Sequence, residues 1–326
     1  MRLQFALIAL IFTLSVSKGN KPMSNPISPS LAVEAILAKA RESTTFTPVE
    51  IKVYQEDHQV YPALLAKMKV SEAGIKIDCL EKFSELGGAI HMSSTDGSLS
   101  RTPYIANLIL IRGLVDFLGD STAEVREEAA RKLVEKVPDL YIRNYGNEVI
   151  DRVIEKPGIG GAIRLLAKVG SERALSTLRS NPAITGQSEF ETSIALAKLG
   201  DVGREEDLIM KYKQEVDERE KGHLALALGF VASPKTILVL ARDLRNPMTY
   251  EWNQRAKRSF RVHVIEGLGQ AYPMERRFWR PNGAPRNDSY YQAIEEWATS
   301  RLGVTWENPR PPFLYEMEVP MAAPKR

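Results

Sequence analysis

The residues best suited to bind a partner lie between positions 255 and 286 of this 326-residue chain, where arginine and aromatic residues are interleaved. Arginine binds carboxylates and phosphates through paired hydrogen bonds, and both residue types are enriched at the centres of protein interfaces. This region could therefore dock an acidic protein, an anionic glycan or an anionic lipid headgroup. Alternatively, the arginine stems simply cover the end of the fold. The candidate partner-binding residues are Trp252, Arg255, Arg258, Arg261, Arg276, Arg277, Phe278, Trp279 and Arg280.

A second set of residues has the types that bind zinc. Glu191, His223 and His263 occupy equivalent positions in three repeated segments, and carboxylate and imidazole groups are zinc ligands. Packed helices lie about 8–10 Å apart, so these three side chains could barely reach a single metal ion. We therefore expect histidines that form hydrogen bonds in a helix interface, and no metal site. The sequence contains no zinc-protease, nucleophile-elbow or phosphate-loop motif, so it predicts neither catalytic residues nor a cofactor.

Five ten-residue segments that resemble one another indicate which elements position these residues. They begin 32, 30, 32 and 40 residues apart, and such a period is typical of stacked supersecondary units. Apolar residues at positions 2, 5, 6 and 9 of each segment form one face of a helix. Small residues at position 5 let a neighbouring helix approach closely. The segments are residues 129–138, 161–170, 191–200, 223–232 and 263–272.

The residues that follow the segments predict where helices end and restart. Gly170 and Gly200 can adopt the left-handed conformation that ends a helix. Ser171, Asp201 and Ser233 then stand where an N-cap belongs. Each unit is therefore predicted to be a helical hairpin, and such hairpins must stack because one alone cannot bury its apolar stripe.

Residues 124–133, with the sequence EVREEAARKL, resemble the HEAT-like repeat and its helix pattern V-R-x-x-A-A-x-x-L. The shorter variant found in phycobilin lyases and many bacterial proteins is the more similar one. The resemblance covers residues 104–272 and is degenerate outside 123–137. It implies an all-α fold, an α-solenoid of stacked helical hairpins that mostly binds other macromolecules, and it implies no particular chemistry. The alternative is a compact helical bundle.

Residues 1–17 have the character of a secretory signal. Arg2 precedes an apolar run that is shorter than the about 20 residues of a transmembrane helix, and small residues precede Lys18. We therefore expect an exported protein, periplasmic or extracellular, with no membrane span in the mature chain. An uncleaved N-terminal anchor is the alternative. Export disfavours nucleic acid as a partner, and a net charge of +3 does not indicate one.

The sequence divides into four parts. Residues 1–17 form the signal, 18–102 a leader and a divergent N-terminal helical cap, 103–272 the solenoid, and 273–326 an arginine/aromatic insertion, a last helix and a Pro-rich tail. Within the cap, residues 31–41 are predicted to be helical and 63–86 to form a helical hairpin. Residues 43–62 are predicted to be irregular, with an extended piece at 49–54, and 87–102 to be loop.

Taken together, these patterns predict an exported scaffold that binds a protein partner through the solenoid surface and carries out no catalysis. One alternative is a polyanion- or glycan-binding module that uses residues 255–286. Another, which only the family resemblance implies, is a lyase-like or cofactor-handling protein.

Overall fold

The computed structural model describes residues 28–88, 90–92, 99–101, 104–186, 188–253, 256–273, 275–278, 288–307 and 317–318. The described chain is mostly helical, so the all-α fold class is confirmed at that level. The N-terminal part contains α2 (Pro29–Arg41), α3 (Pro48–Glu56), α4 (Val60–Lys69), α5 (Ala73–Leu86), β1 (Ile90–Met92), β2 (Leu99–Arg101) and α6 (Leu108–Phe117).

The central part follows as a run of helices joined by short turns. It contains α7 (Ala123–Lys136), α8 (Asp139–Ile142), η1 (Arg143–Tyr145), α9 (Gly146–Glu155), α10 (Ala162–Val169), α11 (Glu172–Ser180), α12 (Pro182–Thr185), α13 (Glu189–Lys198) and α14 (Val202–Gln214). The C-terminal part contains α15 (Glu218–Val231), α16 (Pro234–Arg242), η2 (Asp243–Arg245), β3 (Thr249–Asn253), β4 (Ala256–Ser259), α17 (Arg261–Ala271), η3 (Arg276–Phe278), α18 (Asp288–Leu302) and β5 (Met317–Glu318).

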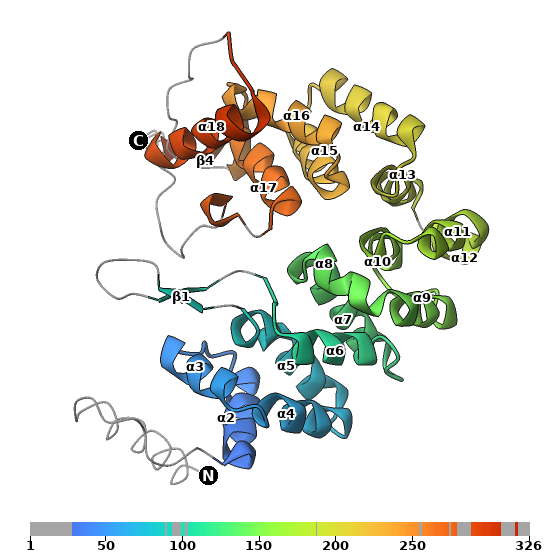
Figure 1. The fold of residues 1–326 in the computed structure, drawn as a ribbon, viewed down its shortest axis with the longest axis vertical. Coiled ribbons are helices and arrows are strands. Elements are labelled where there is room, and N and C mark those ends of the chain that lie inside the picture. The colour runs from blue at the N-terminus through green and yellow to red at the C-terminus, as the bar shows by residue number, and fades with distance from the viewer. Residues whose placement is uncertain are drawn as a thin grey trace, which may run out of the picture.

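The five repeated segments lie in α7, α10, α13, α15 and α17, and each of these helices contacts the next one. The chain forms an arc in which α10, α13 and α15 lie on the inner side, while α9, α11 and α14 lie on the outer side (Figure 1). The apolar face predicted from the segments is buried. At position 6, Leu166, Leu228 and Leu268 are fully buried, whereas Val134 and Leu196 are partly buried against the same core.

The predicted helix ends are confirmed. Gly170 and Gly200 have φ angles of 69° and 97°. The side chain of Ser171 accepts a hydrogen bond from the backbone of Ala174 and so caps α11, and Asp201 and Ser233 cap α14 and α16 in the same way. Each cap satisfies backbone N–H groups that would otherwise lack a partner in the first turn.

The prediction that residues 43–62 are irregular was wrong, because this stretch contains α3 and the start of α4. Thr47 and Glu50 form a capping box in which each side chain accepts from the backbone N–H of the other residue, and Pro48 occupies the first helical position. The predicted helix at 31–41 and the hairpin at 63–86 are confirmed as α2, α4 and α5, whereas the predicted loop at 87–102 contains β1 and β2.

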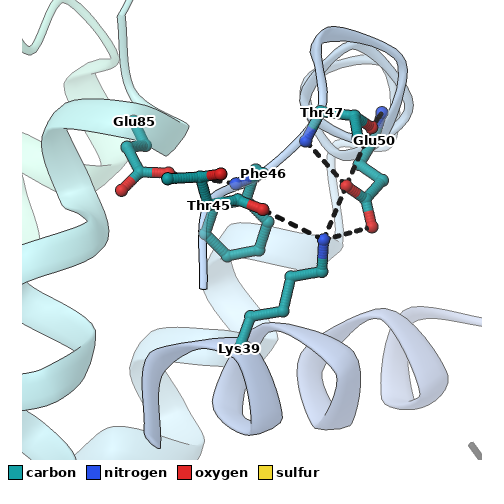
Figure 2. Close-up of polar contacts among 6 residues, drawn as sticks. All are labelled: Lys39, Thr45, Phe46, Thr47, Glu50 and Glu85. Carbon is teal, nitrogen blue, oxygen red and sulfur yellow. Dashed lines mark hydrogen bonds and ion pairs between the residues drawn. The ribbon is translucent and has the colours of Figure 1, made fainter. Parts of the chain in front are cut away.

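Lys39 joins the same capping box to α2, and the segment before the box is joined to α5 by a backbone hydrogen bond (Figure 2). The ammonium group of Lys39, on α2, donates to Glu50 at 2.8 Å and to the carbonyl oxygen of Thr45 at 3.2 Å. The backbone N–H of Phe46 donates to Glu85 on α5 at 3.1 Å. Burial acts to raise the pKa of Glu50, but the hydrogen bonds from Lys39 and Thr47 outweigh it and hold the pKa below its ordinary value of 4.5.

We expect Lys39→Met to lower the free energy of unfolding by about 1 kcal/mol at pH 7, because a partly exposed charged hydrogen bond is lost while the apolar stem is kept. A carboxylate with a lowered pKa stabilises the fold above its unfolded pKa, and that stability is lost as the pH falls through the folded value. The difference from wild type should therefore shrink below about pH 4.5. Urea unfolding of wild type and Lys39→Met at several pH values measures this difference in stability. Lys52→Met, which breaks only an exposed pair with Glu56, serves as the control.

The longest spacing between segments, 40 residues, is explained by a β-hairpin between η2 and α17. Strands β3 and β4 pair antiparallel, with Thr249 opposite Ser259 and an irregularity between Glu251 and Asn253. Strand β5, from the C-terminal tail, pairs antiparallel with the other edge of β4. These short strands carry no periodic pattern from which they could be predicted.

The segment before α6 and helix α17, near the two ends of the arc, contact each other. The hydroxyl group of Tyr104, in the segment that leads into α6, donates to the carbonyl oxygen of Gly269 on α17 at 3.4 Å. These two residues are 165 positions apart in the chain. The N-terminal and C-terminal arms therefore touch.

Candidate functional site

The predicted arginine/aromatic residues fall into three groups in the structure. Trp252 lies in β3 and Arg258 in β4, so both belong to the hairpin that is inserted before α17. Arg276, Arg277 and Phe278 form η3. Arg261 is the first residue of α17. Arg255, Trp279 and Arg280 lie outside the described residues.

Arg261 does not belong to an exposed binding surface, in contrast to the sequence prediction. Its exposed fraction is 3%. Its guanidinium carbon lies 4.2 Å from the ring centroid of Tyr291 on α18, a cation–π contact. Arg245 pairs nearby with Glu295 of α18 at 3.0 Å and lies over the ring of Trp306. These arginines fix the last helix to the fold.

Arg277 is exposed and pairs with Glu275 at 3.0 Å. Its neighbour Phe278 has another environment, because its ring packs edge-on against Trp297 of α18 at 4.9 Å and stacks on Tyr272 at 6.3 Å. Phe278 therefore holds η3 against α18. Of the candidate residues whose side chains the structure describes, only Arg277 is exposed to a partner.

The three residues considered as zinc ligands have separate partners. Glu191 accepts two hydrogen bonds from Arg164 at 2.5 and 2.8 Å. His223 is exposed and lies 3.7 Å from Glu220, whereas His263 is partly buried and lies 3.6 Å from Glu266. In the described part of the chain, no group of three or more His, Cys, Asp and Glu residues is arranged to hold a metal ion.

A charged cluster that the sequence reading missed lies where α7, α8, α10, α13 and α15 meet. Asp139, at the start of α8, pairs with Lys198 of α13 at 2.8 Å and lies 3.5 Å from Lys168 of α10. Lys168 is almost fully buried and donates to the carbonyl oxygens of Val134, Val137 and Leu133 at the end of α7. Burial lowers the pKa of Lys168 to about 8, although Asp139 opposes this shift.

The cluster continues onto α15 through Phe230. The ammonium group of Lys198 donates to the carbonyl oxygen of Phe230 at 2.7 Å and lies 4.8 Å from its ring centroid. The guanidinium group of Arg164 lies 5.4 Å from the same ring while it binds Glu191. Arg164 and Glu191 remain about one-third exposed. Helices α8, α10 and α13 therefore carry an ordered set of charges beside Phe230 of α15, and solvent can reach Arg164, Glu191 and Asp139.

The repeated segments contain a pattern that indicates this cluster. Position 8 of successive segments is occupied by Lys136, Lys168, Lys198 and Phe230. A cation near the last turn of a helix interacts favourably with its carbonyl groups. The structure shows that Lys168 and Lys198 bind carbonyls of a neighbouring unit rather than those of their own helix. The periodicity of a single helix cannot reveal that its lysine binds carbonyl groups of a neighbouring unit.

Within the residues that the structure describes, no helix combines the length and the apolar character needed to cross a membrane. No protein-family model matches the chain, and no curated protein matches it.

Proposed function

We propose that this chain is an exported scaffold that binds a partner protein along the inner helices of an α-solenoid built from HEAT-like hairpins. The successive packing of α7, α10, α13, α15 and α17 supports the solenoid assignment. Residues 1–17, which support export, lie outside the described residues. The proposal assigns binding and no reaction to the fold.

The observation that carries this proposal is the ordered set of charges on the inner helices. Arg164 and Glu191 hold each other through two hydrogen bonds and remain partly exposed, and Asp139 pairs with Lys198 beside them. Groups that are already held in place lose less conformational entropy when a partner binds. Fixed charges of both signs also select a partner with the complementary pattern.

A charge exchange tests the proposal. The double variant Arg164→Glu/Glu191→Arg keeps an ion pair between α10 and α13 but reverses the pattern that a partner meets. We expect it to recover at least tenfold less of a specific partner from the extracytoplasmic fraction, while its melting temperature stays within about 2 °C of wild type. Quantitative mass spectrometry of the captured proteins measures the loss.

The matched control is the exchange Lys235→Glu/Glu206→Lys on the outer helices α14 and α16, where the native pair is exposed at 3.2 Å. Capture by this control should equal that of wild type. If the inner and outer exchanges capture the same proteins in the same amounts, the inner helices are not the binding surface. A binding that instead weakens steeply with salt and needs Arg277 would favour the polyanion-binding alternative.

A further inference from the structure

The hydrogen bonds of Arg164 use only one edge of its guanidinium group. Its Nε and Nη2 atoms donate to the two carboxylate oxygens of Glu191 at 2.5 and 2.8 Å. A guanidinium group carries five N–H donors, so the edge formed by Nη1 and the second hydrogen of Nη2 can bind another carboxylate. No described residue accepts a hydrogen bond from Nη1. Nη1 is not among the buried atoms of the described chain that lack a partner, so solvent reaches it.

The guanidinium group of Arg164 is already held in place. Glu191 fixes its orientation from α13, and the guanidinium carbon lies 5.4 Å from the ring centroid of Phe230 on α15, a cation–π contact. The planar fork of arginine loses little conformational freedom for each hydrogen bond that it forms, and here that freedom is restricted before any partner arrives. The remaining edge is therefore preorganised for binding.

The carboxylates beside Arg164 already have cationic partners. Both oxygens of Glu191 accept from Arg164, and Asp139 lies 2.8 Å from Lys198 and 3.5 Å from Lys168. At neutral pH this cluster contains three cations and two carboxylates, so it keeps a net positive charge. Its unused hydrogen-bonding groups are donors on a cation. The complementary group is therefore a carboxylate, and a basic group would meet like charge.

We propose that Arg164 is the anchor of the inner surface and binds a carboxylate side chain in an acidic segment of the partner protein. The incoming carboxylate occupies the edge formed by Nη1 and Nη2, while Glu191 keeps the other edge, so docking breaks no native ion pair. Arginine is one of the residues that dominate binding energy at protein interfaces. The proposal rests on the proposed function, because it names the chemistry that a partner brings to the same helices.

The test uses the full chain and a fluorescein-labelled hexaglutamate peptide with blocked ends. Wild type should bind this peptide in about 0.15 M salt, as measured by fluorescence anisotropy. Arg164→Lys should bind it at least tenfold more weakly, because lysine keeps the positive charge and loses the planar fork. A hexaglutamine peptide should not bind wild type. The matched control is Arg173→Lys on the outer helix α11, where Arg173 pairs with Asp151 of α9, and it should bind as wild type does.

Stability is checked on the same variants. The melting temperature of Arg164→Lys should stay within about 2 °C of wild type, because lysine can still pair with Glu191. A second measurement needs no variant with reduced stability. In wild type, the nuclear magnetic resonance signal of the Arg164 Nε–H group should shift when hexaglutamate is added, whereas that of Arg173 should stay in place.

The proposal is overturned if hexaglutamate does not bind wild type, or if it binds wild type and folded Arg164→Lys equally. It is also overturned if binding is lost only in Arg277→Glu, because the carboxylates would then dock at η3. Capture experiments separate this proposal from the proposed function. If the inner charge exchange loses its captured partner and Arg164→Lys retains it, only the anchor is wrong. If the exchange captures as wild type does, the inner helices are not the binding surface.

Discussion

Gly229→Ala is expected to lower the free energy of unfolding by about 3 kcal/mol. Helices α15 and α17 approach so closely that a Cβ atom on Gly229 would lie 2.2 Å from the carbonyl oxygen of Gly267. That oxygen belongs to the backbone and cannot rotate away, so the helices must separate and lose packing along their whole contact. Thermal and urea unfolding followed by circular dichroism measure the change.

Gly203→Ala on α14 is the matched control, because a Cβ atom there meets only an ordinary contact at 3.6 Å from Asp201. Alanine is the better helix former, so this variant should equal or exceed wild type in stability. Gly267→Ala should behave like Gly229→Ala, since its Cβ would lie 2.6 Å from the carbonyl oxygen of Ala225. A Gly229→Ala protein as stable as the control would show that α15 and α17 are not packed this closely.

Lys168→Met should be about as damaging, with a loss of about 3 kcal/mol in the free energy of unfolding. Methionine fills the space of the stem but donates no hydrogen bond, so the final carbonyl groups of α7 lose their partner in a buried place. Removal of a buried charge offsets part of that cost. The matched control is Lys235→Met, an exposed lysine that should tolerate the change.

The loss caused by Lys168→Met should depend on pH. Burial lowers the pKa of Lys168 from 10.5 to about 8, so between these values the folded state is neutral at this residue and the unfolded state is charged. Unfolding therefore takes up a proton, and wild type gains stability from this residue as the pH rises from about 8 to about 10.5. The difference between wild type and Lys168→Met should widen over that range. A difference that narrows instead would mean that the ammonium form is retained.

Local sequence signals predicted the helices well because the same apolar pattern occurs in five segments of the chain. The N-caps Ser171, Asp201 and Ser233 follow from residue type and position alone, since a cap depends on the next three residues. The small residue at position 5 of the last segment, Gly267, permits the close approach of α17 to α15 together with Gly229. The capping box of Thr47 and Glu50 is also visible in the sequence, and the prediction that residues 43–62 are irregular overlooked it.

The candidate site was harder to predict because its contacts join residues far apart in the chain. Arg261 belongs to an arginine-rich stretch, and only the position of Tyr291 on α18 shows that Arg261 is buried. The pairing of Asp139 with Lys198 likewise crosses two units. Helical periodicity tells which face of a helix is apolar. It does not tell which polar residue of one unit meets which residue of another.

The contact between Tyr104 and Gly269 has a consequence for how this architecture can change during evolution. Repeat proteins commonly grow or shrink by duplicating or deleting a whole unit, and an array with two free ends tolerates such changes. Here one extra hairpin inserted between α7 and α17 would carry Gly269 away from Tyr104 by the width of a unit. Curvature and the number of helical units must therefore change together, which favours substitution over duplication as the route by which this fold diverges.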